Sequence, residues 1–374
     1  MVRLRDLGVT PGDLPPGPNN AITDVPGVRV GHVTLIAGEG ALVEGVGPVR
    51  TGVTAILPHA GNLFVEKVAG AVHTINGFGK VSGFEQVREL GTIESPILLT
   101  NTMNVGLVAD AVGTYLMREN PDLGVRTGAG NRLVGETNDG FLNDIRGRHV
   151  REQHVWQAIE TATDGPVAEG NVGAGAGTTC FGFKGGIGTA SRQLFDGAVT
   201  VGALVQTNFG GRSHLLVLGA PIGKHFLDRL LPATLPELPA GTGSIMMVLA
   251  TDAPASAHLL ERMARRAAFG LARTGSMCED TSGDFVIAFS TTNRSPQYRQ
   301  EALQRVTQVA RLSEDAWTVS KLFTAVVEVV EEAILNSLVA AETMIGRDNH
   351  IAHALPRDEL ADLLTFYRRR PEGR

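Results

Sequence analysis

Three short runs in which every residue is apolar constrain the fold of this chain more than any other feature. They span Leu215–Leu218, Ile245–Ala250 and Phe285–Phe289. A strand with one face in water alternates apolar and polar residues, whereas a continuously apolar strand is covered on both faces. The runs therefore predict strands of a sheet that lies between two other layers of the protein.

The rest of the chain alternates between strand and helix patterns. Further β-type runs span Val28–Ile36, Gly52–Leu57 and Ala198–Gln206. Apolar residues at helical spacing predict helices over Val105–Met117, Ala255–Ala272, Ser313–Thr343 and Arg357–Arg370. Ser313 and Asp315 provide a start signal for the third of these helices. Because strands and helices alternate without a repeat, we expect a layered α/β architecture.

The composition excludes several classes of protein. With 43% hydrophobic and 19% charged residues, the 374-residue chain can bury a substantial core and is not of the disordered type. A net charge of -6, with basic residues clustered only at the C-terminus, offers no surface for nucleic acid or an anionic membrane. Cys180 and Cys278 are too few for a disulfide framework, and no signal-type segment or transmembrane run is present. We therefore expect a cytoplasmic protein.

The motifs typical of cofactor and metal sites are absent. In the glycine-rich stretch, Gly173, Gly175 and Gly177 form G-x-G-x-G, and Thr178 stands where a dinucleotide fingerprint needs its third glycine. A Walker A loop, a C-x-x-C pair, an H-E-x-x-H helix and a G-x-S-x-G elbow are also missing. His350 and His353 lie near Asp348 without a strong further ligand. We expect no cofactor and no metal, and a structural or substrate-facing role for the glycine-rich turn.

Ser244 lies at the junction of two unlike segments. The Pro- and Gly-rich stretch LPATLPELPAGTG ends at Gly243, and the apolar run begins directly after Ser244. Cleavage between Gly243 and Ser244 would give the serine a free α-amine, whose pKa of about 7.7–8.0 suits a base for the adjacent hydroxyl. The alternative is a loop that enters a strand and carries no chemistry.

Polar residues stand at the ends of the neighbouring apolar runs. Asn208 follows the run that ends at Gln206, and Ser282 and Asp284 precede Phe285–Phe289. If the first of these strands is antiparallel to the other two, all of these residues and Ser244 meet at one edge of the sheet. They would then supply a nucleophile, an amide donor for an oxyanion, and a hydroxyl–carboxylate pair that orients or relays protons.

Several stretches of the chain resemble a known family. They are, in order, ITDVPGVRVGH, GETNDGFLNDIRGRHV, KGGIGTASR, LVQTNFG, GSIMMVLATDAP, LARTGS, TSGDFVIAFST and GRDNHIAHALP. These stretches resemble the L-aminopeptidase/D-esterase family, which includes the β-aminopeptidases and is classed with self-processing serine peptidases. The resemblance extends over nearly the whole chain.

The resemblance implies a four-layer αββα sandwich similar to N-terminal nucleophile hydrolases but with different strand connectivity. It also implies that one domain, residues 1–374, is cut into an α-subunit of residues 1–243 and a β-subunit of residues 244–374. The cleaved units would stay together in a homo-oligomer. The expected substrates are small peptides or amino-acid amides and esters.

The resemblance also assigns roles to individual residues. Gly243–Ser244 would be the scissile bond and Ser244 the nucleophile, with Asn208 as an oxyanion donor. Ser282 and Asp284 match the second serine and the acidic residue of the family, which is Glu in some members. The shorter Asp side chain leaves its partner open.

Two residues in the stretch GETNDG are candidates for substrate binding. Glu136 is a reasonable partner for the ammonium group of the substrate, since a buried unpaired cation is costly; a surface glutamate is the alternative. Asn138 stands where some members carry a tyrosine that assists catalysis, and Phe141 is close by. We therefore expect the phenolic contribution to be absent.

Two other functions remain open at the level of sequence. Ornithine acetyltransferase has a similar fold and self-processing, but it uses a threonine nucleophile, so Ser244 and the TSGD motif favour a hydrolase. An unprocessed, non-catalytic homologue is the second alternative, and only Asn138 points toward it.

Overall fold

The computed structural model describes residues 1–230, 243–297 and 308–369 and contains two central sheets. The first sheet has four strands in the order β1 (Arg29–Ala37), β2 (Val49–Leu57), β5 (Ile97–Asn101) and β6 (Leu133–Thr137). The second has six strands in the order β4 (Thr92–Ile93), β3 (Glu66–Gly77), β12 (Ser282–Pro296), β11 (Gly243–Thr251), β10 (Val199–Asn208) and β9 (Ile187–Leu194). Two small hairpins, β7 (Thr179–Cys180) with β8 (Phe183–Lys184) and β13 (Met344–Ile345) with β14 (Ile351–Ala352), complete the strands.

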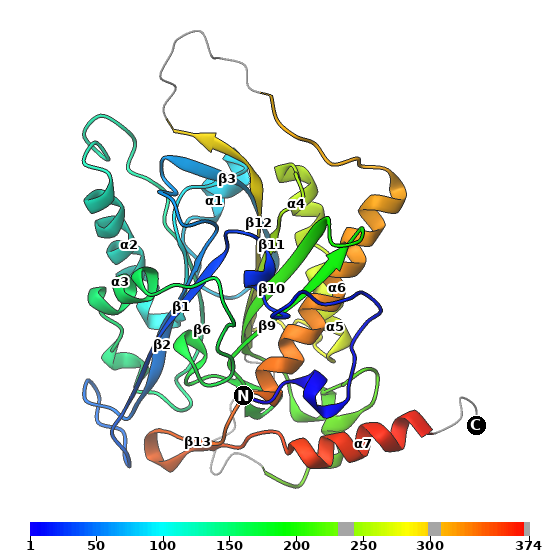
Figure 1. Cartoon of the computed structure of the whole chain (residues 1–374). Coiled ribbons are helices and arrows are strands. Elements are labelled where there is room, and N and C mark those ends of the chain that lie inside the picture. The colour runs from blue at the N-terminus through cyan, green and yellow to red at the C-terminus, as the bar shows by residue number, and fades with distance from the viewer. Residues whose placement is uncertain (231–242, 298–307, 370–374) are drawn as a thin grey trace.

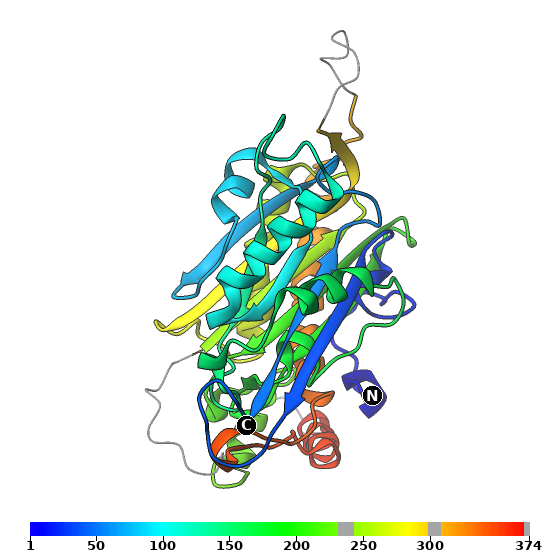
Figure 2. The same cartoon turned by 90° about the vertical axis from the view of Figure 1, so that its left-hand side faces the viewer.

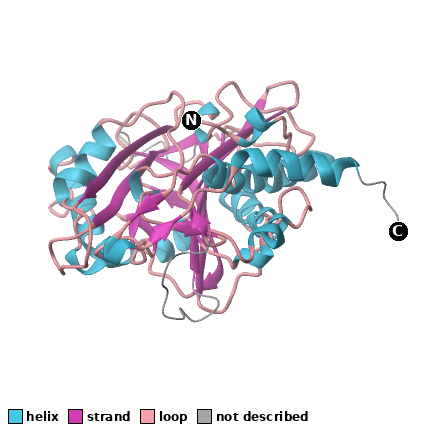
Figure 3. Ribbon diagram, turned by 90° about the horizontal axis from the view of Figure 1, so that it is seen from below, coloured by secondary structure: helices cyan, strands magenta, loops and turns pink. Residues whose placement is uncertain are grey.

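Helices cover the outer face of each sheet (Figures 1 and 3). Beside the four-stranded sheet lie α2 (Val105–Glu119) and α3 (Glu152–Glu160), in front of the strands in Figure 2. The six-stranded sheet is covered by α4 (Ala257–Ala264), α5 (Ala267–Arg273) and α6 (Ala316–Val339). The short α1 (Phe84–Leu90) follows β3, and α7 (Arg357–Arg369) closes the chain. The expected αββα sandwich is therefore observed.

Strand β11 shows why the layers form. Its residues alternate between two separate hydrophobic cores: Ile245 and Met247 pack in the core shared with α6, and Met246 and Val248 in the core between the two sheets. A third core lies between the four-stranded sheet and its helices α2 and α3. Both faces of β11 are thus covered, as the continuously apolar run predicts.

The strand directions around β11 also match the expectation. Strand β10 is antiparallel to β11, whereas β12 is parallel to it. The parallel pair is joined by a crossover through α4 and α5, because parallel neighbours cannot be joined by a tight hairpin. The C-terminal end of β10 and the N-terminal ends of β11 and β12 therefore lie at one edge of the sheet.

One predicted strand and one predicted helix have a different structure from the one expected. Leu215–Leu218 is not a strand: it forms only an isolated bridge between Val217 and Ala220, because Leu218 and Gly219 turn the chain at positive φ. Leu215 and Val217 are buried in the helix-facing core although the segment is a loop. The predicted helix Ala255–Ala272 is split into α4 and α5, and Gly270 of α5 then packs closely on the α6 backbone.

The longest helix begins later than the sequence pattern suggests. Asp315 caps α6 by accepting hydrogen bonds from the N–H groups of Trp317 and Thr318, both at 3.0 Å. Ser313 supports the cap by donating to Asp315 at 2.9 Å. These hydrogen bonds, those from Thr318 first, lower the pKa of Asp315 to about 2. The start signal is therefore real, but the helix covers Ala316–Val339 only.

Buried ion pairs attach the N-terminal arm, residues 1–24, and strand β9 to α6. Arg192, which is fully buried, pairs with Glu328 and with Glu332 at 2.7 Å each. Arg5 in the arm reaches the same Glu332 at 2.7 Å, and the arm crosses α6 in Figure 1. Arg3 pairs with Glu169 at 2.6 Å. The arm is thus part of the folded structure and not a loose extension.

We predict that Arg192→Met lowers the free energy of unfolding by about 3–5 kcal/mol, because the buried Glu328 loses its cationic partner and Glu332 keeps Arg5 but loses Arg192. Urea denaturation followed by circular dichroism measures this change. Arg265→Ala, which removes an exposed pair with Glu261, is the control and should cost less than about 1 kcal/mol. Equal effects of the two substitutions would contradict the prediction.

Candidate active site

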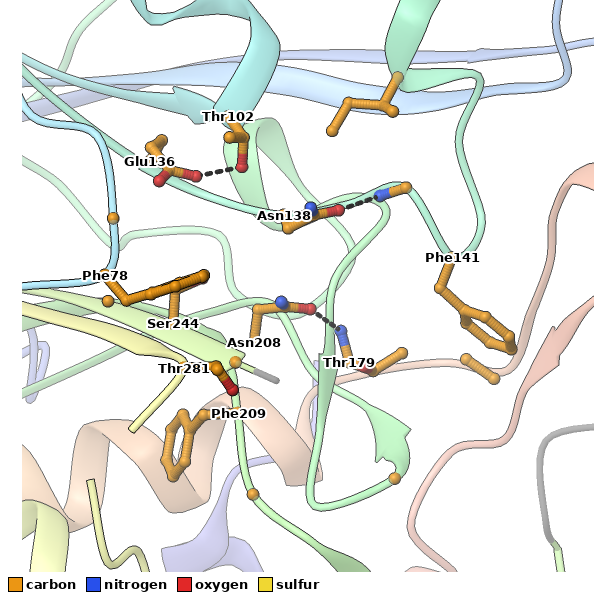
Figure 4. Close-up of a pocket in the computed structure, with 18 of the residues that line it drawn as sticks. Phe78, Thr102, Glu136, Asn138, Phe141, Thr179, Asn208, Phe209, Ser244 and Thr281 are labelled. Carbon is orange, nitrogen blue, oxygen red and sulfur yellow. Dashed lines mark hydrogen bonds between the residues drawn. The ribbon is translucent and has the colours of Figure 1, made fainter. Parts of the chain in front are cut away.

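A cavity of about 810 Å³ opens at the edge of the six-stranded sheet where β10 ends and β11 and β12 begin (Figure 4). Its walls come from segments that are far apart in the sequence. These are residues 78–80 after β3, 136–145 after β6, 179–182 in the β7–β8 hairpin, and 347–352 near β14. The sheet edge thus supplies the floor and the loops supply the walls.

Ser244 lies on the floor of this cavity. It pairs with Asn208 on one side and with Gly283 on the other, so it is held in the middle of the sheet. Its side chain is on the same face of β11 as Met246, toward the four-stranded sheet. Only 4% of Ser244 is exposed, and its Oγ has no hydrogen-bond partner among the described residues. A buried hydroxyl left unpaired is costly, which is typical of a group kept for chemistry.

Asn208 lies directly across from Ser244 and lines the same cavity. Its Oδ1 accepts a hydrogen bond from the N–H of Thr179 at 3.1 Å (Figure 4). Because the oxygen is used in this way, the Nδ2 group is the part of the amide left to donate toward the cavity. This orientation suits a donor for an oxyanion that forms beside Ser244.

Ser282 and Asp284 reach the same sheet edge but face the other way. Gly283 is the residue of β12 opposite Ser244, so its neighbours on either side point to the helix-facing side of the sheet. Ser282 Oγ donates to Asp284 Oδ1 at 2.7 Å. Thr281 and Gly283 line the cavity, whereas Ser282 and Asp284 do not.

The Asp284 carboxyl is buried, and burial raises its pKa. Hydrogen bonds from Ser282 and Cys278 act in the opposite direction without overcoming the burial. The structure therefore brings all four predicted catalytic residues to one edge. It places the Ser282–Asp284 pair beneath the floor on which Ser244 and Asn208 lie.

Glu136 enters the cavity from the other sheet, at the end of β6. Its Oε1 accepts from the N–H of Lys80 at 2.8 Å, and its Oε2 accepts from Thr102 Oγ1. Burial raises the pKa of Glu136, and these hydrogen bonds oppose the rise. Glu136 is 3% exposed, and within the described part of the chain its bonded partners are the Lys80 N–H and the Thr102 hydroxyl, so its carboxylate is suited to receive a cation from a ligand.

Asn138 also lines the cavity, and its Oδ1 accepts from the N–H of Gly140 at 2.8 Å. This hydrogen bond shapes the turn after β6. Both predicted substrate-binding residues therefore lie in the cavity that contains Ser244.

Sequence reasoning missed two residues that shape the site. Phe78 lines the cavity that contains Ser244 although 57% of the residue is exposed, and no motif marks it (Figure 4). Arg212 is buried behind the cavity wall and donates to the carbonyls of Phe181, Gly182, Phe226, Arg229 and Leu230. Burial lowers the pKa of Arg212 to about 10. A lone arginine carries no signal for such a role.

The glycine-rich turn serves packing between the sheets. A Cβ at Gly173 would lie 2.3 Å from Thr54 Oγ1, and one at Gly177 would lie 2.0 Å from the Arg50 carbonyl. The fully buried Lys184 donates to the Gly175 carbonyl at 2.9 Å, and burial lowers its pKa to about 7. The structural role considered for this turn is therefore the one observed.

No set of three His, Cys, Asp or Glu side chains within residues 1–230, 243–297 and 308–369 is placed to hold a metal ion. Both cysteines are free thiols. None of the helices in those ranges combines the length and apolar character needed to span a bilayer.

The sequence model of peptidase family S58 matches residues 20–352. The chain belongs to this family. It is 46% identical to the β-peptidyl aminopeptidase BapA of Sphingosinicella microcystinivorans, over 98% of this chain and 93% of that protein. Among solved structures, the β-aminopeptidase of a Burkholderia species is 42% identical with a TM-score of 0.87, covering 99% of this chain and 100% of that one.

A third relative connects the fold with the chemistry. The L-aminopeptidase D-Ala-esterase/amidase of Ochrobactrum anthropi is 39% identical with a TM-score of 0.88, covering 98% of this chain and 99% of that one. That structure is described as a prototype of the serine aminopeptidases and a variant of the Ntn hydrolase fold. The resemblance drawn from the motifs is confirmed, and the S58 chain is an aminopeptidase of the hydrolase class.

We predict that Asn208→Ala lowers kcat/KM for an amino-acid p-nitroanilide by about 10²–10³-fold, the usual effect of removing one oxyanion donor. Steady-state kinetics measure the loss, and circular dichroism checks that the variant stays folded. A folded variant that loses less than tenfold would show that Asn208 does not serve the transition state.

Proposed function

We propose that this S58 member is a self-processing N-terminal serine aminopeptidase. Cleavage of Gly243–Ser244 would divide one αββα domain into residues 1–243 and 244–374. The supporting observation is the position of Ser244: its buried, unpaired hydroxyl lies on the cavity floor beside the Asn208 amide. The Pro-rich residues 231–242 lie outside the described part of the chain.

In the proposed maturation, Ser244 Oγ attacks the carbonyl carbon of Gly243. The peptide C–N bond breaks, an ester forms, and the proton lost from Oγ passes to the amine of Ser244. Water then hydrolyses the ester, which yields the Gly243 carboxylate and the free hydroxyl. Glycine is required here because a Cβ at Gly243 would lie 2.9 Å from Phe209 Cα and 3.1 Å from the Asn208 carbonyl.

In the mature enzyme, the α-amine of Ser244 would act as the base for its own hydroxyl. Gly243 pairs with Ser282, so the new N-terminus enters the sheet beside the Ser282–Asp284 pair. We assign that pair to the amine and not to Oγ. The hydroxyl and the carboxyl would hold and orient the ammonium form, which suits their position beneath the cavity floor.

The substrate would bind by its own free amine. Glu136 receives the ammonium group, the carbonyl carbon lies at Ser244 Oγ, and Asn208 Nδ2 donates to the developing oxyanion. The chemical class is therefore a small peptide, amide or ester with an unblocked amino terminus. The names of the relatives point to β-peptidyl, L-amino-acid and D-Ala ester substrates as the first compounds to compare.

Two further expectations from the sequence belong to this proposal. We place the enzyme in the cytoplasm, and we expect the cleaved units to form a homo-oligomer. The S58 match supports a hydrolase over an ornithine-acetyltransferase-like enzyme.

We predict that the purified wild-type chain gives two bands on a denaturing gel and that Ser244→Ala gives one. Mass spectrometry of the smaller fragment should read Ser244 as its first residue. Ser213→Ala changes an exposed serine and is the matched control, which should be processed normally. An intact wild-type chain with full peptidase activity would refute self-processing.

We predict that Glu136→Gln raises KM for substrates with a free amine by at least about tenfold, because the partner of the ammonium group loses its charge. Burial raises the pKa of Glu136, so the wild-type carboxylate is protonated as the pH falls through that raised pKa. The wild-type kcat/KM should therefore fall on the acid side through the titration of Glu136 in addition to that of the Ser244 amine, and the variant should keep only the part due to the amine. A variant with an unchanged acid limb would assign the titration to another group.

A further inference from the structure

The strand register shows which part of the cavity lies on each side of Ser244. Across the sheet the order is Gly283 of β12, then Ser244, then Asn208 of β10. A Cβ at Gly79 would touch both Glu136 Oε1, at 3.2 Å, and the Phe285 ring, and a Cβ at Gly283 would touch Gly79. Glu136 therefore lies on the β12 side of the nucleophile.

The opposite side of the nucleophile is bounded by different residues. Asn208 is bonded to Thr179 of the β7–β8 hairpin, and the cavity continues beyond them to Phe141 (Figure 4). A substrate with its amine at Glu136 and its carbonyl at Ser244 must therefore direct the group that departs toward Thr179 and Phe141.

This far side carries an ordered aromatic wall. The Phe141 ring stacks on His350 with 4.7 Å between ring centroids and 12° between planes. His350 Nδ1 is fixed by the Phe141 carbonyl at 2.8 Å. Ile145 and Ala352 also line this side of the cavity, and their segments are far apart in the sequence.

The charges near this wall are already paired. Arg347 Nε donates to the Gly140 carbonyl at 2.7 Å, and its Nη1 pairs with Asp348 at 2.7 Å. An incoming ligand therefore meets a preformed aromatic and aliphatic surface, beside which Arg347 and Asp348 already pair with each other. Such a surface favours flat or branched apolar groups.

We propose that Phe141, His350 and Ile145 form the leaving-group subsite, which takes an aromatic or aliphatic amine such as the second residue of a dipeptide. This assignment rests on the proposed function, since it takes Ser244 as the nucleophile and Glu136 as the amine site. The subsite would determine which leaving groups the enzyme prefers, and Glu136, which binds the amine of the acyl half, does not determine that preference.

The order of the chemical steps makes the subsite testable. Ser244 Oγ attacks the substrate carbonyl, the C–N bond breaks, and the proton held by the Ser244 amine goes to the departing amine. The acyl-enzyme left behind carries no leaving group, so its hydrolysis by water is the same for all substrates with one acyl half. The subsite therefore acts on acylation only.

The experiment compares two substrates that share one acyl residue: its primary amide and its 2-phenylethyl amide. Wild-type enzyme should have the higher kcat/KM for the phenylethyl amide. Phe141→Ala should lower that kcat/KM about tenfold and change the value for the primary amide less than twofold. Phe141→Leu should restore part of the difference. Equal losses for both substrates in Phe141→Ala would overturn the subsite.

Two additional measurements separate the possible failures. Phe269→Ala removes an exposed ring on α5, one of the helices that cover the six-stranded sheet. It should leave kcat/KM for both substrates unchanged. N-Acetyl-2-phenylethylamine, which has no ammonium group for Glu136, should inhibit the wild type competitively and Phe141→Ala about tenfold more weakly. A wild type that is neither processed nor active on the primary amide would refute the proposed function and the subsite with it. A processed, active wild type whose preference survives Phe141→Ala would refute the subsite alone.

Discussion

The site depends on one feature of the six-stranded sheet, the register that places Asn208, Ser244 and Gly283 side by side. Because side chains alternate along a strand, a slip of one residue in β11 would turn Ser244 away from the cavity and toward α6. The register is fixed by the two hydrophobic cores that β11 separates, where Met246 and Ile245 face opposite ways. Burial on both faces thus holds the nucleophile in place more firmly than a loop could.

The second sheet completes the site because its distance from the first is set by close packing. A Cβ at Gly135 would lie 2.3 Å from Met246 Cε, so the glycine before Glu136 lets the Met246 side chain of the other sheet pack directly on its backbone. Glu136 is then held by Lys80 and Thr102 at the mouth of the same cavity. The carboxylate and the nucleophile are more than a hundred residues apart, yet one inter-sheet contact places them together.

The sequence predicted where the strands begin and end, but not which face of the sheet each polar residue occupies. Ser244 and Asn208 could be predicted because each stands where a long apolar run begins or ends. The face occupied by Ser282 and Asp284 follows from the pairing of Gly283 with Ser244, and strand pairing is a tertiary property that composition does not record. Leu215–Leu218 was wrongly predicted as a strand because burial alone does not distinguish a strand from a buried loop. Phe78 lines the same cavity as Ser244 although it is far from it in the sequence, and no local pattern encodes this position.

The proposed cut also explains why the ion pairs on α6 matter. Arg5 and Arg192 belong to the segment before Ser244, whereas Glu328 and Glu332 belong to the segment after it. Strand β11 remains paired with β10 along Val201–Asn208, so the sheet ladder also crosses the two segments. Cleavage would therefore remove one peptide bond at the edge of a sheet whose hydrogen bonds, cores and buried charges all continue across the break. These interactions would hold the two fragments together after cleavage. The new N-terminus could then act as a base while the fold that positions it is kept.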